Sequence, residues 1–444
     1  MFAWLEKLDQ FLWGIPLLIL ILGVGSYISI ATRFAQLRLF PEALCGFLRQ
    51  LKPNGRSSSY KALCTALAAT VGTGNLAGVA GAIAIGGPGA VFWMWICGII
   101  GMGIKFAEAT LAVTYRERTP EGEYIGGPMY MIKNGLCKHY HWLATVYCFF
   151  GVVASFGVGN ATQINTVIAG INDIANNFDF NLTLSAKLLI GFGLGFLLVF
   201  LLAGGGKRIS ETAEKLVPIA SCGYLLLGFT VLVLHFEYIP GAFLQIIKGA
   251  LSPGAMTGGV VGSIFVPLRI GAARGVFTNE AGMGTAAIAH ATAGVKTPVE
   301  QGLMGIIEVF LDTIVICTVT ALVILCSGVN IPYGNDVGVS LTTNAFEAVC
   351  GSWVTIPLTI ALCLFAVATV LGWGFYGARC AQFLFGKGAW KRFVLLQGVV
   401  VVLGACLQTK TVWVVSDILN GLMAIPNLIV IMMLIPVLRK KIRA

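Results

Sequence analysis

The sequence predicts an all-α integral membrane protein of about eleven transmembrane helices, built as two inverted five-helix halves with one extra N-terminal helix. Of its 444 residues, 57% are hydrophobic and only 11% are charged, whereas a soluble chain carries about 25% charged residues. The apolar stretches are continuous and long enough to cross ~30 Å of hydrocarbon as helices, which excludes a β-barrel. Two polar, glycine-interrupted segments lie five spans apart, so their helices run in opposite directions.

Eleven apolar segments carry this prediction. They are residues 13–32, 62–85, 90–114, 143–171, 184–203, 213–234, 257–289, 300–327, 352–378, 391–407 and 412–437. The first lies in a leading segment, outside the repeat. The expected units are an N-terminal helix in 1–32, a first half in 33–236, an inverted second half in 237–437 and a basic tail in 438–444. Residues 240–250 and 338–350 are expected to form short amphipathic helices on the outer face.

The net charge of +10 reflects topology rather than nucleic-acid binding. Of the 29 lysines and arginines, Lys105, Arg269 and Arg274 lie within spans. Four more lie in the segments expected outside: Lys7, Lys187, Lys248 and Lys410. The remaining 22 lie in, or just beside, the loops and tail on the other side. Because basic residues concentrate in cytoplasmic loops, we expect a multi-pass cell-membrane protein with its N-terminus outside and its C-terminus in the cytoplasm.

The stretch "VGTGNLAG" (71–78) interrupts an apolar span. Each glycine weakens a helix by roughly 1 kcal/mol relative to alanine, and Asn75 adds an amide that lipid does not solvate. Such a segment is stable at this depth when it lines a cavity whose contents satisfy its amides and carbonyls. The N–H groups that begin the following half-helix suit a carboxylate, and freed carbonyls suit a cation such as Na⁺. A small-residue packing face between helices is the alternative interpretation.

A second interrupted segment echoes the first. "TGNLAGVAGAIA" (73–84) and "TNEAGMGTAAIA" (278–289) match at four of twelve positions without gaps. Interrupted helices at corresponding positions of two inverted halves indicate a transporter binding site.

The stretch "GGPGAVFWMWICGIIG" (86–101) resembles the signature of the alanine/glycine:cation symporter family, the sodium:alanine symporters. "GTGNLAGVAGAIA" and "FTNEAGMGTAAIAHA" also resemble that family, and the likeness covers essentially the whole chain. The sequence departs from the signature at Gly98, where a slightly larger small residue is more frequent. This resemblance implies the LeuT-type fold.

The resemblance implies a sodium site between the first broken helix, in "TVGTGN" (70–75), and a later helix, in "FAVAT" (365–369). The implied sodium ligands are the carbonyls of Ala68, Val71 and Ala366 and the hydroxyl of Thr369. Val370 stands where that fold often has a second hydroxyl, so the sequence does not supply that oxygen.

The resemblance also implies a substrate site. The turn of the first break would bind the substrate carboxylate, Phe277 would pack over the substrate, and Met283 would form the floor of the side-chain pocket. The expected substrate-binding residues are Gly72, Thr73, Gly74, Asn75, Gln163, Phe277, Thr278, Gly282, Met283 and Trp373. An interhelical hydrogen bond is the alternative for Gln163, as it is for Asn160 and Asn165, and core packing is the alternative for Trp373.

Charged residues within the spans are expected to be paired, because an unpaired charge in the membrane is costly. Lys105 and Glu108 have helical spacing and are expected to pair locally. Glu308 and Asp312 share a helix face and are expected to meet Arg269 or Arg274. Glu280 is also charged within a span, and His290 is expected to cap a helix end.

These features predict a secondary active transporter and not an enzyme, because no catalytic cluster accompanies them. The resemblance implies sodium-coupled symport of alanine and glycine, and we expect import into the cell by alternating access. Sodium is the expected coupling ion, with no organic cofactor; the expected partners are the amino acid and the lipid bilayer, and no nucleic acid. Proton coupling is an open alternative, and an ion channel is the alternative from another class, although channels usually need a symmetric filter.

Overall fold

The structure is a computed structural model that describes residues 2–51, 57–176, 180, 182–335, 338–407 and 409–443. Apart from one short antiparallel pair of strands, its regular elements are helices. Three short π-helical segments interrupt the helices, and two of them, η1 and η3, are rich in small residues. The prediction of an all-α fold is confirmed.

The elements run along the chain from α1 at the N-terminus to α22 at the C-terminus. They are α1 (Phe2–Leu12), α2 (Ile15–Ala31), α3 (Ala35–Arg38), α4 (Phe40–Gln50), α5 (Ser58–Thr70), η1 (Gly74–Gly78), α6 (Val79–Gly86), α7 (Gly89–Tyr115), β1 (Glu117–Arg118), β2 (Tyr124–Ile125), α8 (Pro128–Gly135), η2 (Lys138–Tyr140), α9 (Trp142–Phe156), η3 (Gly157–Ala161), α10 (Thr162–Asn176), α11 (Leu184–Ala203), α12 (Gly205–Leu234), η4 (Phe236–Tyr238), α13 (Ile239–Leu251), α14 (Pro253–Met256), α15 (Phe265–Asn279), α16 (Thr285–His290), α17 (Pro298–Val309), η5 (Phe310–Ile316), α18 (Cys317–Cys326), α19 (Ser340–Cys350), η6 (Ser352–Val354), α20 (Thr355–Phe385), α21 (Ala389–Gly404) and α22 (Thr409–Arg443).

The number of membrane-spanning helices is lower than the sequence predicts when it is judged by length and composition. Among the described residues, eight helices are long and apolar enough to cross a membrane, and the bent pair α5–α6 gives a ninth. The expected count of eleven is therefore not confirmed. The region 257–289, expected as one span, becomes helical at Phe265 and divides into two short helices, which are α15 and α16.

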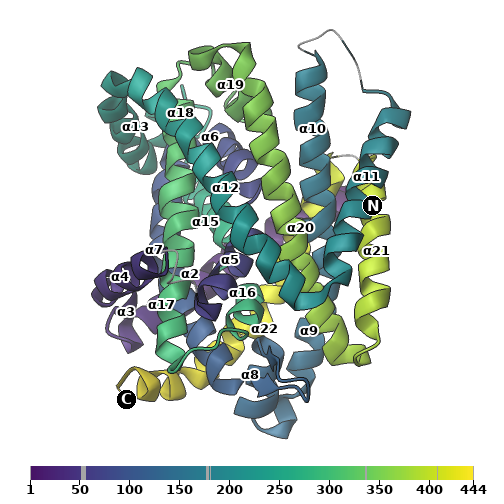
Figure 1. The fold of residues 1–444 in the computed structure, drawn as a ribbon. Helices are drawn as coiled ribbons and strands as arrows, with labels where there is room; N and C mark the ends of the chain where they lie inside the picture. Colours follow the sequence, from purple (N-terminus) through teal and green to yellow (C-terminus); the bar gives the residue numbers. More distant parts are fainter. Residues whose placement is uncertain are drawn as a thin grey trace.

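The two broken helices lie antiparallel at the centre of the bundle (Figure 1). Helix α6 packs on α15, and α5 packs on α16, so that each half-helix has a partner from the other half. The long helix α20 passes both breaks and contacts α5 and α16. Small residues permit this closeness: a Cβ on Gly372 of α20 would lie 2.7 Å from the Ala69 amide nitrogen of α5.

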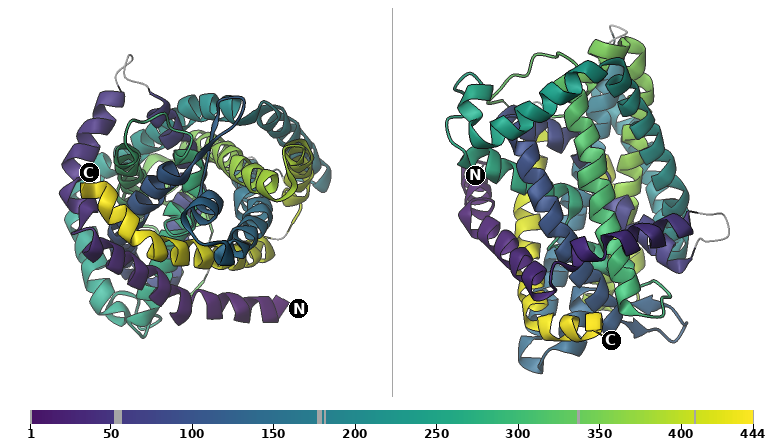
Figure 2. Two further views of the ribbon diagram at one scale, coloured as in Figure 1. Left: turned by 90° about the horizontal axis from the view of Figure 1, so that it is seen from below. Right: turned by 90° about the vertical axis from the view of Figure 1, so that its left-hand side faces the viewer.

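The loops that carry most basic residues gather at one end of the molecule. Helix α8 and the C-terminus lie at that end, and α13 and α19 lie at the other (Figure 1). The N-terminal helices lean along the outside of the bundle (Figure 2). Helices α13 and α19 are the short helices expected near 240–250 and 338–350.

Two of the predicted loops contain helices. Residues 204–212 were expected to form a loop, but α12 begins at Gly205 and continues through this segment to Leu234. The predicted loop 33–61 contains α3 and α4. Helix α4 packs on α17, and this burial makes an amphipathic segment helical outside the long apolar runs.

Candidate functional site

The first break separates α5 from α6 and bends their axes by 52°. At Val71 the backbone is extended, so the turn that follows loses its helical hydrogen bonds. Two carboxamide oxygens replace them. Asn75 Oδ1 accepts from the Gly72 amide at 2.8 Å, and Gln163 Oε1 accepts from the Thr73 hydroxyl at 2.8 Å and its amide at 3.4 Å. The interhelical hydrogen bond considered for Gln163 is therefore present.

The hydroxyl of Thr369 lies directly against this break. A Cβ added to Gly72 would come within 2.5 Å of Thr369 Oγ1, so only glycine fits there without displacing that side chain. Thr369 is 2% exposed, and its hydroxyl has no hydrogen-bond partner among the described residues. Because buried polar groups are almost always hydrogen-bonded, this oxygen is free to bind a ligand. Ala366 lies one turn earlier on α20 and is fully buried.

The other predicted sodium ligands lie at the end of α5. Ala68 and Val71 are buried in its last turn and its C-cap, and Val71 immediately precedes Gly72. The fold thus brings the end of α5 to the face of α20 that carries Thr369.

The second break follows Asn279 and reverses the backbone through left-handed conformations. Glu280, Gly282 and Gly284 have φ values of +53°, +92° and +74°. Phe277 lies one turn earlier and packs across the first break, because a Cβ on Gly74 would meet its ring at 3.3 Å. The two breaks are therefore in direct contact.

A buried carboxylate caps the second break. Glu108 Oε1 of α7 accepts from the amides of Gly282 and Gly284 at 3.0 and 3.1 Å, and from Asn427 Nδ2 at 2.7 Å. The same Asn427 nitrogen donates to the Gly282 carbonyl. The amides of the second break therefore already have a carboxylate acceptor within the protein.

Trp373 is fully buried, and its indole forms a hydrogen bond with a residue of the second break. Its Nε1 donates to Glu280 Oε1 at 2.6 Å, and the Thr285 hydroxyl donates to the other oxygen of that carboxylate. A Cβ on Gly159 in the π-helix η3 would collide with Trp373, so η3 packs directly on this side chain. Trp373 thus ties α20 to the second broken helix.

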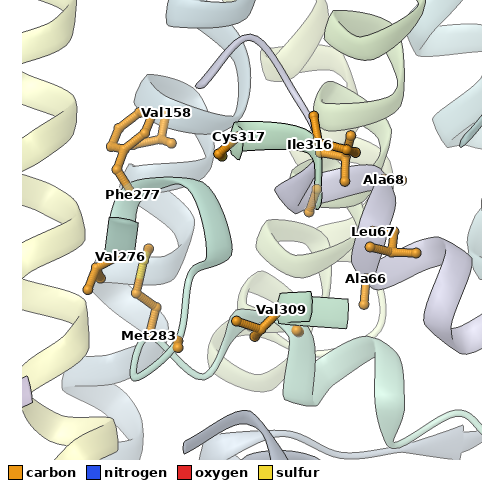
Figure 3. Close-up of a cluster of buried hydrophobic side chains, with 14 of the residues drawn as sticks. Ala66, Leu67, Ala68, Val158, Val276, Phe277, Met283, Val309, Ile316 and Cys317 are labelled. Carbon is orange, nitrogen blue, oxygen red and sulfur yellow. The ribbon is translucent and has the colours of Figure 1, made fainter. Parts of the chain in front are cut away.

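A cluster of buried apolar side chains surrounds the region between the breaks (Figure 3). Phe277 lies beside Val158 on one side of the cluster, and Met283 lies further along the same side. Ala68 of α5 lies on the opposite side. Thr278 directs its hydroxyl to the Gly275 carbonyl at 2.9 Å, within its own helix.

The two breaks are joined by a chain of hydrogen bonds through η5, from Asn75 at the first break to Asn279 at the end of α15. Asn75 Nδ2 donates to Asp312 Oδ1 at 2.7 Å, and the Thr313 hydroxyl donates to Asp312 Oδ2 at 2.8 Å. Asn279 Nδ2 donates to Thr313 at 3.1 Å, while Asn279 Oδ1 accepts from the Ala281 amide. Asn75 and Asp312 therefore fix both breaks relative to each other.

The predicted charge pairs are wrong, because the charged residues have other partners in the structure. Lys105 Nζ lies 2.9 Å from Glu308 on α17, not beside Glu108, because the two helices face each other at this point. Glu308 also contacts His290 Nε2 at 2.8 Å. His290 is fully buried, so it is an internal partner and not the simple helix cap that was expected.

The arginines pair elsewhere as well. Arg274 contacts Asp417 of α22 at 3.3 Å instead of Glu308 or Asp312. Trp13 donates its indole N–H to the Asp417 carbonyl at 2.8 Å, so the leading helices contact this pair. Arg269 lines a small cavity of about 80 Å³ beside it.

A larger cavity of about 360 Å³ lies past the end of α16, between Ile288, the β1–β2 hairpin and the end of α20. Arg379 contacts Glu123 at 3.1 Å, and Lys387 contacts Glu121 at 2.6 Å across this region. The hydrogen bond from Lys387 lowers the pKa of Glu121 to about 2. This cavity is a polar opening next to the second broken helix.

Several residues of the site carry no strong signal in the sequence. The sequence marks Glu108 as a charge within a membrane span. It does not reveal the partners of Glu108, because they are far apart in the chain. Asn427 and Asp417 are not among the predicted site residues. Each is a polar residue within the predicted span 412–437, and a polar residue in a span is a pattern that indicates a site residue. Among the described residues, no group of three or more His, Cys, Asp or Glu side chains could hold a metal ion.

The helical fold with two inverted breaks defines a membrane transporter of the LeuT type. The crystal structure of MhsT in complex with L-phenylalanine is similar at a TM-score of 0.61 and 15% identity, covering 84% of this chain and 88% of that one. A sodium-coupled sialic acid symporter in a substrate-bound outward-open state is similar at a TM-score of 0.50 and 13% identity, covering 95% of this chain and 86% of that one. Both comparisons support the fold.

The chain belongs to the sodium:alanine symporter family, whose model matches residues 1–444. It is 39% identical over 436 residues to the sodium/alanine symporter AgcS of Methanococcus maripaludis, covering 97% of this chain and 94% of that one. It is 41% identical over 432 residues to an uncharacterized transporter of Haemophilus influenzae, covering 96% and 92%. It is 38% identical to the amino-acid carrier protein AlsT of Bacillus subtilis, covering 96% and 88%. The protein is therefore a multi-pass membrane transporter of a sodium-coupled amino-acid symporter family.

Proposed function

We propose that this protein imports alanine and glycine together with Na⁺ by alternating access. The observation that carries the proposal is the buried Thr369 hydroxyl, which has no partner among the described residues and lies against Gly72 at the first break. Hard cations such as Na⁺ bind oxygen ligands. The carbonyls of Ala68, Val71 and Ala366 would complete the cation site.

The amino acid would bind beside the cation, at the first break. Its carboxylate would meet the amides of the Gly72–Gly74 turn, where Gly74 presents no side chain. Thr73, Asn75 and Gln163 supply polar groups around this turn. The second break supplies Phe277 and Thr278, with Gly282 at the turn itself and Met283 beyond it.

The preference for small substrates follows from the large residues at this place. Phe277, Met283 and Trp373 are buried, and the Phe277 ring lies 3.3 Å from a Cβ placed on Gly74. A methyl side chain fits beside such groups more readily than an isobutyl group does. The N-terminus would lie outside and the C-terminus in the cytoplasm, as the distribution of basic residues favours.

Equilibrium binding tests this proposal directly. Labelled alanine is added to the purified protein in NaCl, and in KCl at the same ionic strength and pH. We expect affinity to be at least tenfold higher in NaCl, which is about 1.4 kcal/mol. Equal affinity in both salts, with a strong dependence on pH, would support the proton-coupled alternative instead.

A further inference from the structure

The Gly72 and Thr73 amides of the first break already have acceptors within the protein, and these acceptors come from two different helices. Asn75 lies on the broken helix itself and is held by Asp312 at 2.7 Å, so its bond to the Gly72 amide is part of a fixed network. Gln163 comes from α10, a different helix, and reaches across to Thr73. Gln163 is therefore the acceptor that does not belong to the broken helix itself.

The carboxamide of Gln163 bridges two helices that both lose regular hydrogen bonds here. Its oxygen accepts from Thr73, and its nitrogen donates to the Val158 carbonyl in η3 at 3.0 Å. A Cβ on Gly72 would lie 3.5 Å from this oxygen and 2.5 Å from Thr369 Oγ1. The Gln163 oxygen is therefore already the acceptor for the Thr73 amide and hydroxyl, at the turn where the proposed function places the substrate carboxylate.

We infer that Gln163 is a placeholder: its carboxamide oxygen occupies the carboxylate position of the substrate-free carrier and allows that carrier to close and return empty. The inference rests on the proposed function and deepens it. A carboxylate makes charge-assisted hydrogen bonds that are roughly twice as strong as those of a neutral carboxamide. The substrate therefore displaces Gln163 from Thr73, whereas an analogue without a carboxylate does not.

The placeholder matters most when the site is empty. If Gln163 left Thr73 with no substrate present, a buried amide and a buried hydroxyl would lose their acceptor, which is unfavourable. The bond also joins α10 to the first broken helix in the absence of substrate. Net uptake requires the empty carrier to return, whereas exchange of substrate for substrate does not, so the two activities separate this role from ordinary binding.

The test compares net uptake with exchange in proteoliposomes. Gln163→Met keeps the length of the side chain and removes its hydrogen-bonding groups. Labelled alanine is supplied outside with a Na⁺ gradient and an empty lumen for net uptake, and with unlabelled alanine on both sides for exchange. We expect the ratio of exchange to net uptake to rise at least fivefold. Thr166→Val is the matched control on the same helix, because its hydroxyl donates to the Thr162 carbonyl of its own helix at 2.8 Å.

The outcomes are distinct. An unchanged ratio in a folded Gln163→Met protein overturns the inference, and so does an equal loss of both activities, which would make Gln163 a ligand of the bound substrate. If Gln163→Met does not fold, Thr73→Val removes the partner hydroxyl from the other side and should raise the same ratio. Absence of alanine transport in the unmodified protein would instead contradict the proposed function.

Discussion

At the scale of single residues, a substitution at Thr369 tests cation binding without an expected loss of folding stability. Its hydroxyl makes no hydrogen bond in the described part of the protein, so Thr369→Val removes the proposed cation ligand without breaking an internal hydrogen bond. We expect the Na⁺ affinity that supports alanine binding to fall at least tenfold, about 1.4 kcal/mol. The melting temperature without Na⁺ should stay the same or rise, because an unsatisfied buried group is removed.

Thr359→Val is the control for this experiment. It lies on the same helix, and its hydroxyl contacts the Gly170 carbonyl at 3.4 Å, far from the break. Na⁺ titrations of alanine binding compare the two variants. An unchanged Na⁺ dependence in Thr369→Val would remove this residue from the cation site.

A substitution at Gly74 tests where the substrate carboxylate binds. Gly74→Leu places a branched side chain against the Phe277 ring, which lies 3.3 Å from the first added carbon. We expect alanine binding to fall below detection while the protein still inserts and folds. Gly223→Leu, where no atom lies within 4 Å of an added carbon, should bind normally. Near-native binding by Gly74→Leu would mean that the carboxylate docks elsewhere.

Met283 is expected to control the size of the substrate pocket. Met283→Ala enlarges the space beyond the second break, and each methylene that it accommodates is worth ~0.8 kcal/mol. We expect leucine or valine to compete measurably with labelled alanine, with a weaker preference for alanine. If leucine already competes well in the unmodified protein, or gains nothing in the folded variant, Met283 does not line the pocket.

At the scale of elements, the second break depends on one carboxylate from another helix. Glu108→Ala leaves the amides of Gly282 and Gly284 without their acceptor and removes one of the two acceptors of Asn427 Nδ2. Each unsatisfied buried group costs about 1–3 kcal/mol. We expect thermal unfolding in detergent to occur at a clearly lower temperature than in Glu211→Ala, a control at an exposed position of α12. A similar melting temperature for both variants would show that water replaces the carboxylate.

The elements also show what the sequence could predict. Both breaks were predictable, because glycine and polar residues in an apolar span weaken a helix wherever it lies. The partners of the charged side chains were not predictable, because spacing along one helix does not show which other helix faces it. Lys105 thus pairs with Glu308 across two helices, although Glu108 lies one turn away. Gln163 was recognised as a candidate, but its bond to Thr73 depends on how α10 meets the first break.

At the scale of the whole molecule, the two ends of the site differ. On one side of the breaks, Arg274 and Asp417 join α15 to α22, and Trp13 adds the leading helix to this contact. Past α16, a cavity of about 360 Å³ opens beside the β1–β2 hairpin. The two sides of the breaks therefore differ: an ion pair joins the helices on one side, and a cavity lies beside α16 on the other.

The most direct test of sodium-coupled transport is Na⁺-driven alanine uptake into proteoliposomes that contain only this protein. An inward Na⁺ gradient should drive labelled alanine above its equilibrium concentration, and a proton gradient alone should not. Thr369→Val should need at least tenfold more Na⁺ for the same rate. Accumulation that is equal without Na⁺, or that follows only the proton gradient, would contradict sodium-coupled transport by this protein.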